Sequence, residues 1–144
     1  MKITKEDVID CLKENSKYIG ALALKVYGES LNQVGERAFS EAIEIGIENT
    51  IASLYDANVP DKEIVRVVCE YWGITNSETE ERLIYEKQQA AIRSLGQYME
   101  LQGYSIIDIN SFMSKYKVRI RHEKELWKLK DAPEKLFKVL QKND

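Results

Sequence analysis

The chain has 144 residues, of which 44% are hydrophobic and 31% are charged, with only 7 Gly and 2 Pro. This is the size and composition of one globular, mainly helical domain, and it argues against a disordered or all-β chain. The formal net charge is −3. Residues 1–114 carry 11 Lys and Arg against 19 Asp and Glu, whereas residues 115–142 carry 10 against 4. The body is therefore acidic, and the C-terminal subregion 115–142 is basic.

The opening residues, MKITKEDVIDCLKEN, mix charged and apolar side chains and lack the apolar run of a signal peptide. No window approaches the roughly 18 to 20 apolar residues that a membrane span needs. Cys11 and Cys69 lie far apart, each within an apolar helical pattern, which favours reduced and buried thiols. We expect a soluble, cytoplasmic protein with no membrane partner.

Helical periodicity predicts one long helix, or two collinear ones, from Thr4 to Gly28, because the apolar stripe is interrupted at Asn15 and Ser16. A further helix is predicted from Ser30 to about Ala57. This further helix carries a stripe of small residues: Gly35, Ala38, Ala42, Gly46, Asn49 and Ser53. Beside it runs a bulky stripe: Phe39, Ile43, Ile47, Thr50 and Leu54. Small side chains let a partner helix approach closely. Because each glycine costs about 1 kcal/mol relative to alanine in a helix, we expect a packing reason for both.

Three further helices follow in the central part of the chain. One begins at Pro60 and ends near Gly73. The next runs to Gly103 and starts with the capping box of Ser77 and Glu80, or alternatively with that of Thr75 and Glu78. A shorter helix opens at Ser105, and its apolar positions are Ile106, Ile109, Phe112, Met113 and Tyr116.

The period changes at Lys115. Over residues 115–122 basic and apolar residues alternate, which is the period of a strand. No second strand is evident, so the segment is either an extended connector packed on the helices or an edge that awaits a partner. A short helix over 123–129 and a last helix opened by Pro133 complete the chain. The sequence thus predicts a compact all-α bundle of about six to seven helices, in one domain 1–144, with one short extended segment near 115–122.

Catalytic motifs are missing from the sequence. His122 is the single histidine, and there is no phosphate-binding loop, nucleophile elbow or dinucleotide fingerprint. Glu41, Glu44 and Glu48 share one helical face, which would suit a hard cation, but a solvated acidic stripe is the more ordinary interpretation. We therefore predict no enzymatic activity, no cofactor and no metal.

The stretch YWGITNSETEERL, residues 71–83, resembles the turn of a helix-turn-helix in its first half. Its second half has polar residues where that motif needs apolar ones. It also places Glu78, Glu80 and Glu81 where phosphates would repel them. The pattern favours a corner between two core helices.

The basic residues near the C-terminus form the best candidate surface. Cations along an extended backbone can follow phosphates or an acidic protein groove, and exposed aromatic rings can stack on bases. The candidate partner-binding residues are Lys115, Tyr116, Lys117, Arg119, Arg121, Lys124, Trp127, Lys128 and Lys130. Trp127 lies between Leu126 and Leu129, which is more typical of a core anchor.

These patterns predict a small, non-enzymatic interaction protein, an adaptor, regulator or inhibitor that binds a protein partner. Small acidic helical proteins of this kind are often encoded by mobile elements and phages. The alternative is a nucleic-acid-binding protein that uses residues 115–130. A homodimer also remains open, because the partner of the small-residue stripe is not fixed by the sequence.

Overall fold

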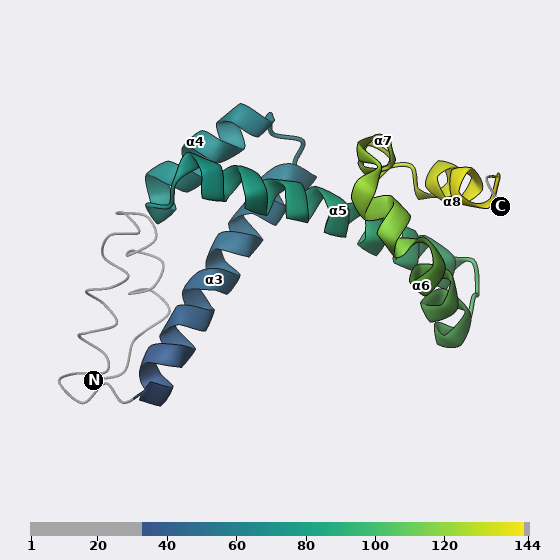
Figure 1. Cartoon of the computed structure of the whole chain (residues 1–144), viewed down its shortest axis with the longest axis horizontal. Helices are drawn as coiled ribbons and strands as arrows, with labels where there is room; N and C mark the ends of the chain where they lie inside the picture. The colour runs from purple at the N-terminus through teal and green to yellow at the C-terminus, as the bar shows by residue number, and fades with distance from the viewer. Residues whose placement is uncertain (1–32, 143–144) are drawn as a thin grey trace. The chain divides into compact units, whose positions relative to one another are not determined.

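A computed structural model describes residues 33–142, of which 84% are helical and none is in a strand. The predicted all-α class is therefore confirmed for this part of the chain (Figure 1). The described helices are α3 (Gln33–Asp56), α4 (Asp61–Trp72), α5 (Asn76–Leu101), α6 (Ile106–His122), α7 (Lys124–Trp127) and α8 (Pro133–Lys142). The helix expected over residues 4–28, with Cys11, lies outside the described residues.

The chain divides into two compact units, Met1–Leu83 and Ile84–Asp144, and the division falls within α5. In the first unit a buried cluster joins three helices. Its fully or nearly fully buried members are Ile47, Ile51, Ile64, Val68 and Leu83. The bulky stripe predicted on α3 contributes Ile47 to this core, with Ile43 and Leu54 packed against it. In contrast, Ala38 and Ala42 of the small-residue stripe are exposed.

Gly46 is the member of the small-residue stripe with a clear packing reason. A Cβ atom placed there would lie 2.5 Å from Cη2 of Trp72, so the indole of α4 rests directly on the α3 backbone. The Trp72 Nε1 group donates a hydrogen bond to the Thr50 hydroxyl (3.1 Å), which in turn donates to the Gly46 carbonyl (2.8 Å). The sequence expectation for Gly46 is thus confirmed, and the contact fixes α4 on α3.

Residues 71–83 form the corner between α4 and α5. Gly73 ends α4 in the left-handed region, with φ of 69°, which glycine adopts without a steric penalty. The Thr75 hydroxyl accepts a hydrogen bond from the backbone N–H of Glu78 (3.2 Å), so the alternative predicted start is the one formed, and Ser77 lies inside the first turn. Thr79 is fully buried behind it.

The second unit is built from the rest of α5 together with α6, α7 and α8. Its core consists of Ala91, Leu95, Met99, Tyr116, Ile120, Leu126, Trp127, Leu136, Phe137 and Leu140. The Phe137 ring of α8 stacks on Phe112 of α6 with 5.0 Å between centroids. Ser94 of α5 donates a hydrogen bond to the Lys130 carbonyl, which holds the connection between α7 and α8 against α5.

Ser105 begins α6 as predicted. Its hydroxyl accepts a hydrogen bond from the Asp108 N–H (3.1 Å), and the Asp108 carboxylate accepts from the Ser105 N–H, which completes a capping box. We expect Ser105→Ala to lower the free energy of unfolding by about 1 kcal/mol, because the Asp108 N–H loses its acceptor. Urea denaturation of the full chain measures this. Ser111→Ala, at an exposed position within the same helix, is the control that should cause no loss.

The extended segment predicted near 115–122 is wrong, because these residues form the last two turns of α6. Phe112, Tyr116 and Ile120 are spaced by four residues, and the last two are buried in the core. A spacing of four residues is compatible with one face of a helix, just as the alternation is compatible with a strand. The helix that begins after Ser105 continues through residues 115–122. Glu123 ends the helix in an extended conformation, with φ of −100° and ψ of 100°.

Candidate functional site on helices α6 and α7

The helical conformation of residues 115–122 redistributes the candidate cations. In an α-helix each residue advances by about 100°, so Lys115 and Arg119 form one pair and Lys117 and Arg121 form another, about 160° away around the axis. The strand period predicted over residues 115–122 would have placed all four cations on one side, and the helix does not. The buried Tyr116 and Ile120 lie between the two pairs, and each pair borders the core on its own flank.

The first pair is occupied by interactions inside the second unit. The Arg119 Nε group donates to the Glu123 carboxylate at 2.8 Å. The Lys115 ammonium lies 5.1 Å from the centroid of the Tyr116 ring, within the range of a cation–π contact. Arg119 is therefore paired at the end of α6, and Lys115 contacts the ring of a core residue.

The charges of the second pair, Lys117 and Arg121, are not neutralised in this way. Neither Lys117 nor Arg121 forms an ion pair with any residue between 33 and 142, although both are partly buried. The Nε atom of Arg121 is buried without a hydrogen-bond acceptor among the described residues. Lys124, the first residue of α7, is exposed and likewise forms no ion pair there. We call Lys117, Arg121 and Lys124, with Val118, the basic face.

The remaining candidate cations are bound to neighbouring carboxylates. Lys128 contacts Glu125 at 2.9 Å, on the surface. Lys130 is buried and contacts the Asp131 carboxylate at 2.9 Å, so it belongs to the connection between α7 and α8. The exposed pair of Lys128 and Glu125 contributes little to stability, but it lowers the net charge that a partner meets.

Both candidate aromatic residues are in the core. Tyr116 is 6% exposed and Trp127 is 7% exposed. The Trp127 Nε1 group donates a hydrogen bond to the Ile120 carbonyl at 2.6 Å, which satisfies an acceptor that the end of α6 leaves open. Neither ring is available for a base to stack upon, while the core position agrees with the flanking Leu126 and Leu129.

Val118 is a surface residue that sequence reasoning missed. It is 61% exposed and lies on the side of α6 opposite Tyr116 and Ile120, three residues before Arg121. An alternating pattern assigns Val118 to the same side as Tyr116 and Ile120, which hides it. Helical periodicity applied from Ser105 onward would have placed it on the surface.

The other groups that the sequence singled out do not converge. Glu41, Glu44 and Glu48 are exposed on α3, and Glu44 contacts Arg82 at 2.6 Å. This hydrogen bond raises the pKa of the Arg82 guanidinium, which also contacts Glu78. Within residues 33–142 no group of three or more His, Cys, Asp or Glu side chains is arranged to hold a metal ion. His122 is exposed at the end of α6.

Cys69 is the free thiol within the described range. Its Sγ atom lies 3.1 Å from the Asn76 side-chain oxygen and 3.3 Å from the Thr79 hydroxyl. These contacts join α4 to the start of α5. The sequence predicted a reduced, buried thiol, and Cys69 is a free thiol that is only partly buried. In the same part of the chain, no helix has both the length and the apolar character that membrane crossing requires.

No protein-family model, curated protein or solved structure matches this chain. The basic face must therefore be interpreted from its own geometry and charge.

Proposed function

We propose that this protein is a non-enzymatic interaction protein that binds an acidic surface of a protein partner through the basic face. The observation that carries the proposal is the pair Lys117 and Arg121, which are uncompensated by any described carboxylate, beside the exposed Val118. An apolar centre with cations around it is typical of protein interfaces, where arginine is enriched and pairs with carboxylates in a bidentate manner.

Arg121 is suited to such a contact for a specific energetic reason. Its Nε atom makes no hydrogen bond within the described residues, so a rotation of the side chain toward a partner breaks none at that atom. A guanidinium hydrogen bond to a carboxylate is worth more than one between neutral groups. The new contact therefore does not have to offset the loss of an existing hydrogen bond at that atom.

Nucleic acid is the alternative occupant of the basic face. The burial of Tyr116 and Trp127 removes the stacking surface that single strands use, and the acidic body of the chain repels a polyanion. Binding to nucleic acid would weaken steeply with salt, by about one unit of log–log slope for each phosphate contacted. Gel-shift assays at low salt, with single- and double-stranded DNA and RNA, test this alternative directly.

Charge reversal of the basic face tests the proposal. We expect Lys117→Glu/Arg121→Glu to weaken binding to a purified partner by at least about a hundredfold, which corresponds to roughly 3 kcal/mol. The partner is identified by affinity capture after nuclease treatment, and its affinity is measured by calorimetry. Helical content should stay near that of the wild type, because neither side chain makes an ion pair that the substitution would break. The melting temperature should fall only slightly, since a glutamate at residue 121, in the last turn of α6, costs about 0.3–1 kcal/mol.

Lys135→Glu/Lys142→Glu is the matched control. Both lysines are exposed on α8, and the double substitution changes the net charge by the same amount. If this control weakens binding equally, the attraction is a general effect of charge. If binding survives Lys117→Glu/Arg121→Glu, the basic face is not the interface and the proposal is wrong.

A further inference from the structure

The corner between α5 and α6 carries the most exposed large hydrophobic side chains in the described part of the chain. Leu101 is 84% exposed, Ile106 is 77% exposed and Ile107 is 78% exposed. All three lie within seven residues around Gly103, whose φ of 85° makes the turn. Exposed aliphatic residues that gather at one place mark an interaction site more often than scattered ones do.

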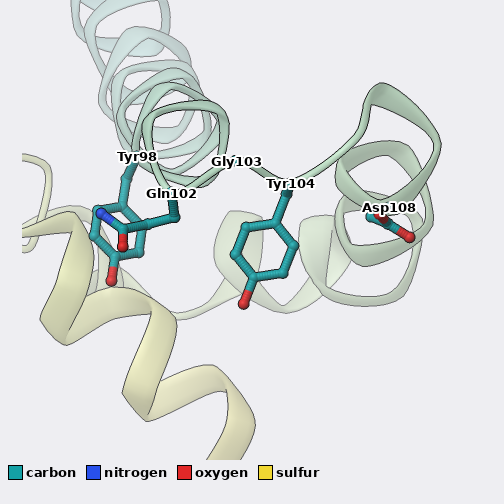
Figure 2. Close-up of a pocket in the computed structure, with 5 residues that line it drawn as sticks. All are labelled: Tyr98, Gln102, Gly103, Tyr104 and Asp108. Atoms are coloured by element: carbon teal, nitrogen blue, oxygen red, sulfur yellow. The ribbon is translucent and has the colours of Figure 1, made fainter.

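A polar hollow lies at the same corner. It has a volume of about 300 Å³ and is lined by Tyr98, Gln102, Gly103, Tyr104 and Asp108. Figure 2 shows that Tyr98 comes from α5, Gln102 and Tyr104 from the connection between α5 and α6, and Asp108 from the first turn of α6, and that the two phenol groups extend in similar directions. The corner thus combines hydrogen-bonding groups with aliphatic side chains.

The tyrosine rings of the hollow are held by the core. Tyr98 and Tyr104 lie 5.8 Å and 5.9 Å, between centroids, from the Phe137 ring of α8. Because these rings are packed on one side, a ligand that uses their hydroxyls does not need to order them first. Asp108 uses Oδ2 for the capping box with Ser105, and its Oδ1 accepts no hydrogen bond from a described residue.

The charge of the corner indicates what it would bind. Between residues 99 and 114 the sequence contains Glu100 and Asp108 and no Lys or Arg. Lys138 of α8 interacts electrostatically with Tyr98, but its ammonium group is paired with the Glu134 carboxylate at 2.5 Å. That hydrogen bond is the main reason why the pKa of Lys138 is raised. The corner therefore combines exposed apolar side chains with a negative formal charge, whereas the basic face has a positive charge.

We propose that the α5–α6 corner is a second docking surface, which binds a protein segment that presents an aliphatic residue next to an arginine or lysine. The aliphatic residue contacts Leu101 or Ile107, beside the turn. The cation enters the hollow, where the Asp108 carboxylate and the faces and hydroxyls of Tyr98 and Tyr104 accept it. An acidic membrane surface fits less well, because Glu100 and Asp108 would face its headgroups.

The corner goes beyond the proposed function, since it comprises other residues and takes a partner segment of opposite charge. From Ile107 to Lys117 the α6 axis rises about 15 Å, so the corner and the basic face can be altered separately. A chain with two such surfaces can hold two different segments at once.

A random-peptide display selection against the full-length protein tests the corner. We expect enriched peptides to contain aliphatic residues next to arginine or lysine, and synthetic copies to bind with affinities measurable by fluorescence anisotropy. Leu101→Ser/Ile106→Ser/Ile107→Ser should weaken this binding at least tenfold, and Tyr98→Phe/Tyr104→Phe by several fold, because the hydroxyls are lost while the rings remain. Circular dichroism checks that each variant is folded.

Two control variants check that the loss of peptide binding is specific to the corner. Ile45→Ser alters an exposed aliphatic residue of α3 and should leave peptide binding unchanged. Lys117→Glu/Arg121→Glu should also leave peptide binding unchanged. The proposals for the corner and for the basic face can therefore be refuted independently of each other.

Several outcomes would overturn the inference. These are a selection that enriches no peptide, enriched peptides that are acidic, and binding that survives the triple serine substitution. Self-association in sedimentation that the triple substitution abolishes would assign the corner to a second copy instead. Binding to phosphatidylcholine vesicles with phosphatidylglycerol, lost in the same variant, would assign it to a membrane surface.

Discussion

Trp127→Ala should lower the free energy of unfolding by about 3–5 kcal/mol, the range for a large aromatic side chain removed from a core. The indole is almost fully buried among the residues that join α6, α7 and α8. Its removal leaves a cavity, and it also leaves the Ile120 carbonyl without the hydrogen bond that Nε1 supplies. Because this loss is a large part of the stability of an ordinary domain, we expect residues 84–142 to be partly unfolded at 37 °C.

Trp127→Phe separates the two contributions. It keeps most of the apolar contact and loses the hydrogen bond, so a loss clearly smaller than that of the alanine variant is expected. Urea denaturation followed by circular dichroism at 222 nm gives both values. A loss below about 1 kcal/mol for Trp127→Ala would mean that α7 does not anchor the second unit.

Gly46→Val should destabilise the first unit, with an expected loss of about 2–3 kcal/mol from overpacking. A Cβ atom at residue 46 meets the indole of Trp72 at 2.5 Å, and the branched side chain adds two further methyl groups. The indole cannot move away freely, because its Nε1 group donates a hydrogen bond to the Thr50 hydroxyl. The gain in helix propensity over glycine is only a few tenths of a kcal/mol and does not offset the clash.

A double-mutant cycle with Trp72→Phe identifies the cause. Phenylalanine lacks the outer ring that Gly46 contacts, so Gly46→Val should cost less in the Trp72→Phe background than in the wild type, with a coupling free energy above about 1 kcal/mol. Thermal and urea denaturation of the four proteins supply the numbers. If the losses of stability caused by the two substitutions are additive, contact with the indole is not the reason for a glycine at residue 46.

The helices could largely be predicted from local signals. Gly73 and Gly103 end helices, Pro60 immediately precedes α4, and Ser105 begins α6 with the capping box that its sequence indicates. Each of these residues acts through its own backbone or through a partner three residues away, so the sequence contains all the information that is needed. The buried Trp127 was also indicated by its leucine neighbours.

The alternating residues 115–122 could not be assigned from their own pattern. Eight residues with period two place Tyr116 and Ile120 on one side of a strand, but the same residues lie one helical turn apart. The choice depends on Phe112 and on the ring of Phe137, which comes from a helix 25 residues further along the chain. Contacts between distant segments decide such cases, and they are not visible in a local pattern.

The candidate surfaces were only partly predictable for the same reason. The sequence identifies the cations, but the conformation decides that Arg119 is paired with Glu123 and that Arg121 is not paired. Ile106 was expected to contribute to an apolar helix face, but it is 77% exposed, although helical geometry places it only about 40° from Ile120 and about 80° from Tyr116 around the axis. The corner around Gly103 therefore emerges only from the fold.

The two tryptophans have a practical consequence for work with this protein. The chain contains no others, and Trp72 packs on α3 in the first unit while Trp127 lies in the core of the second. Each unit therefore carries its own intrinsic fluorophore. Denaturation of the single-tryptophan variants Trp72→Phe and Trp127→Phe, followed by emission wavelength, reports on one unit at a time. Coincident midpoints would reveal a single cooperative transition, and separated midpoints would reveal two independently melting parts.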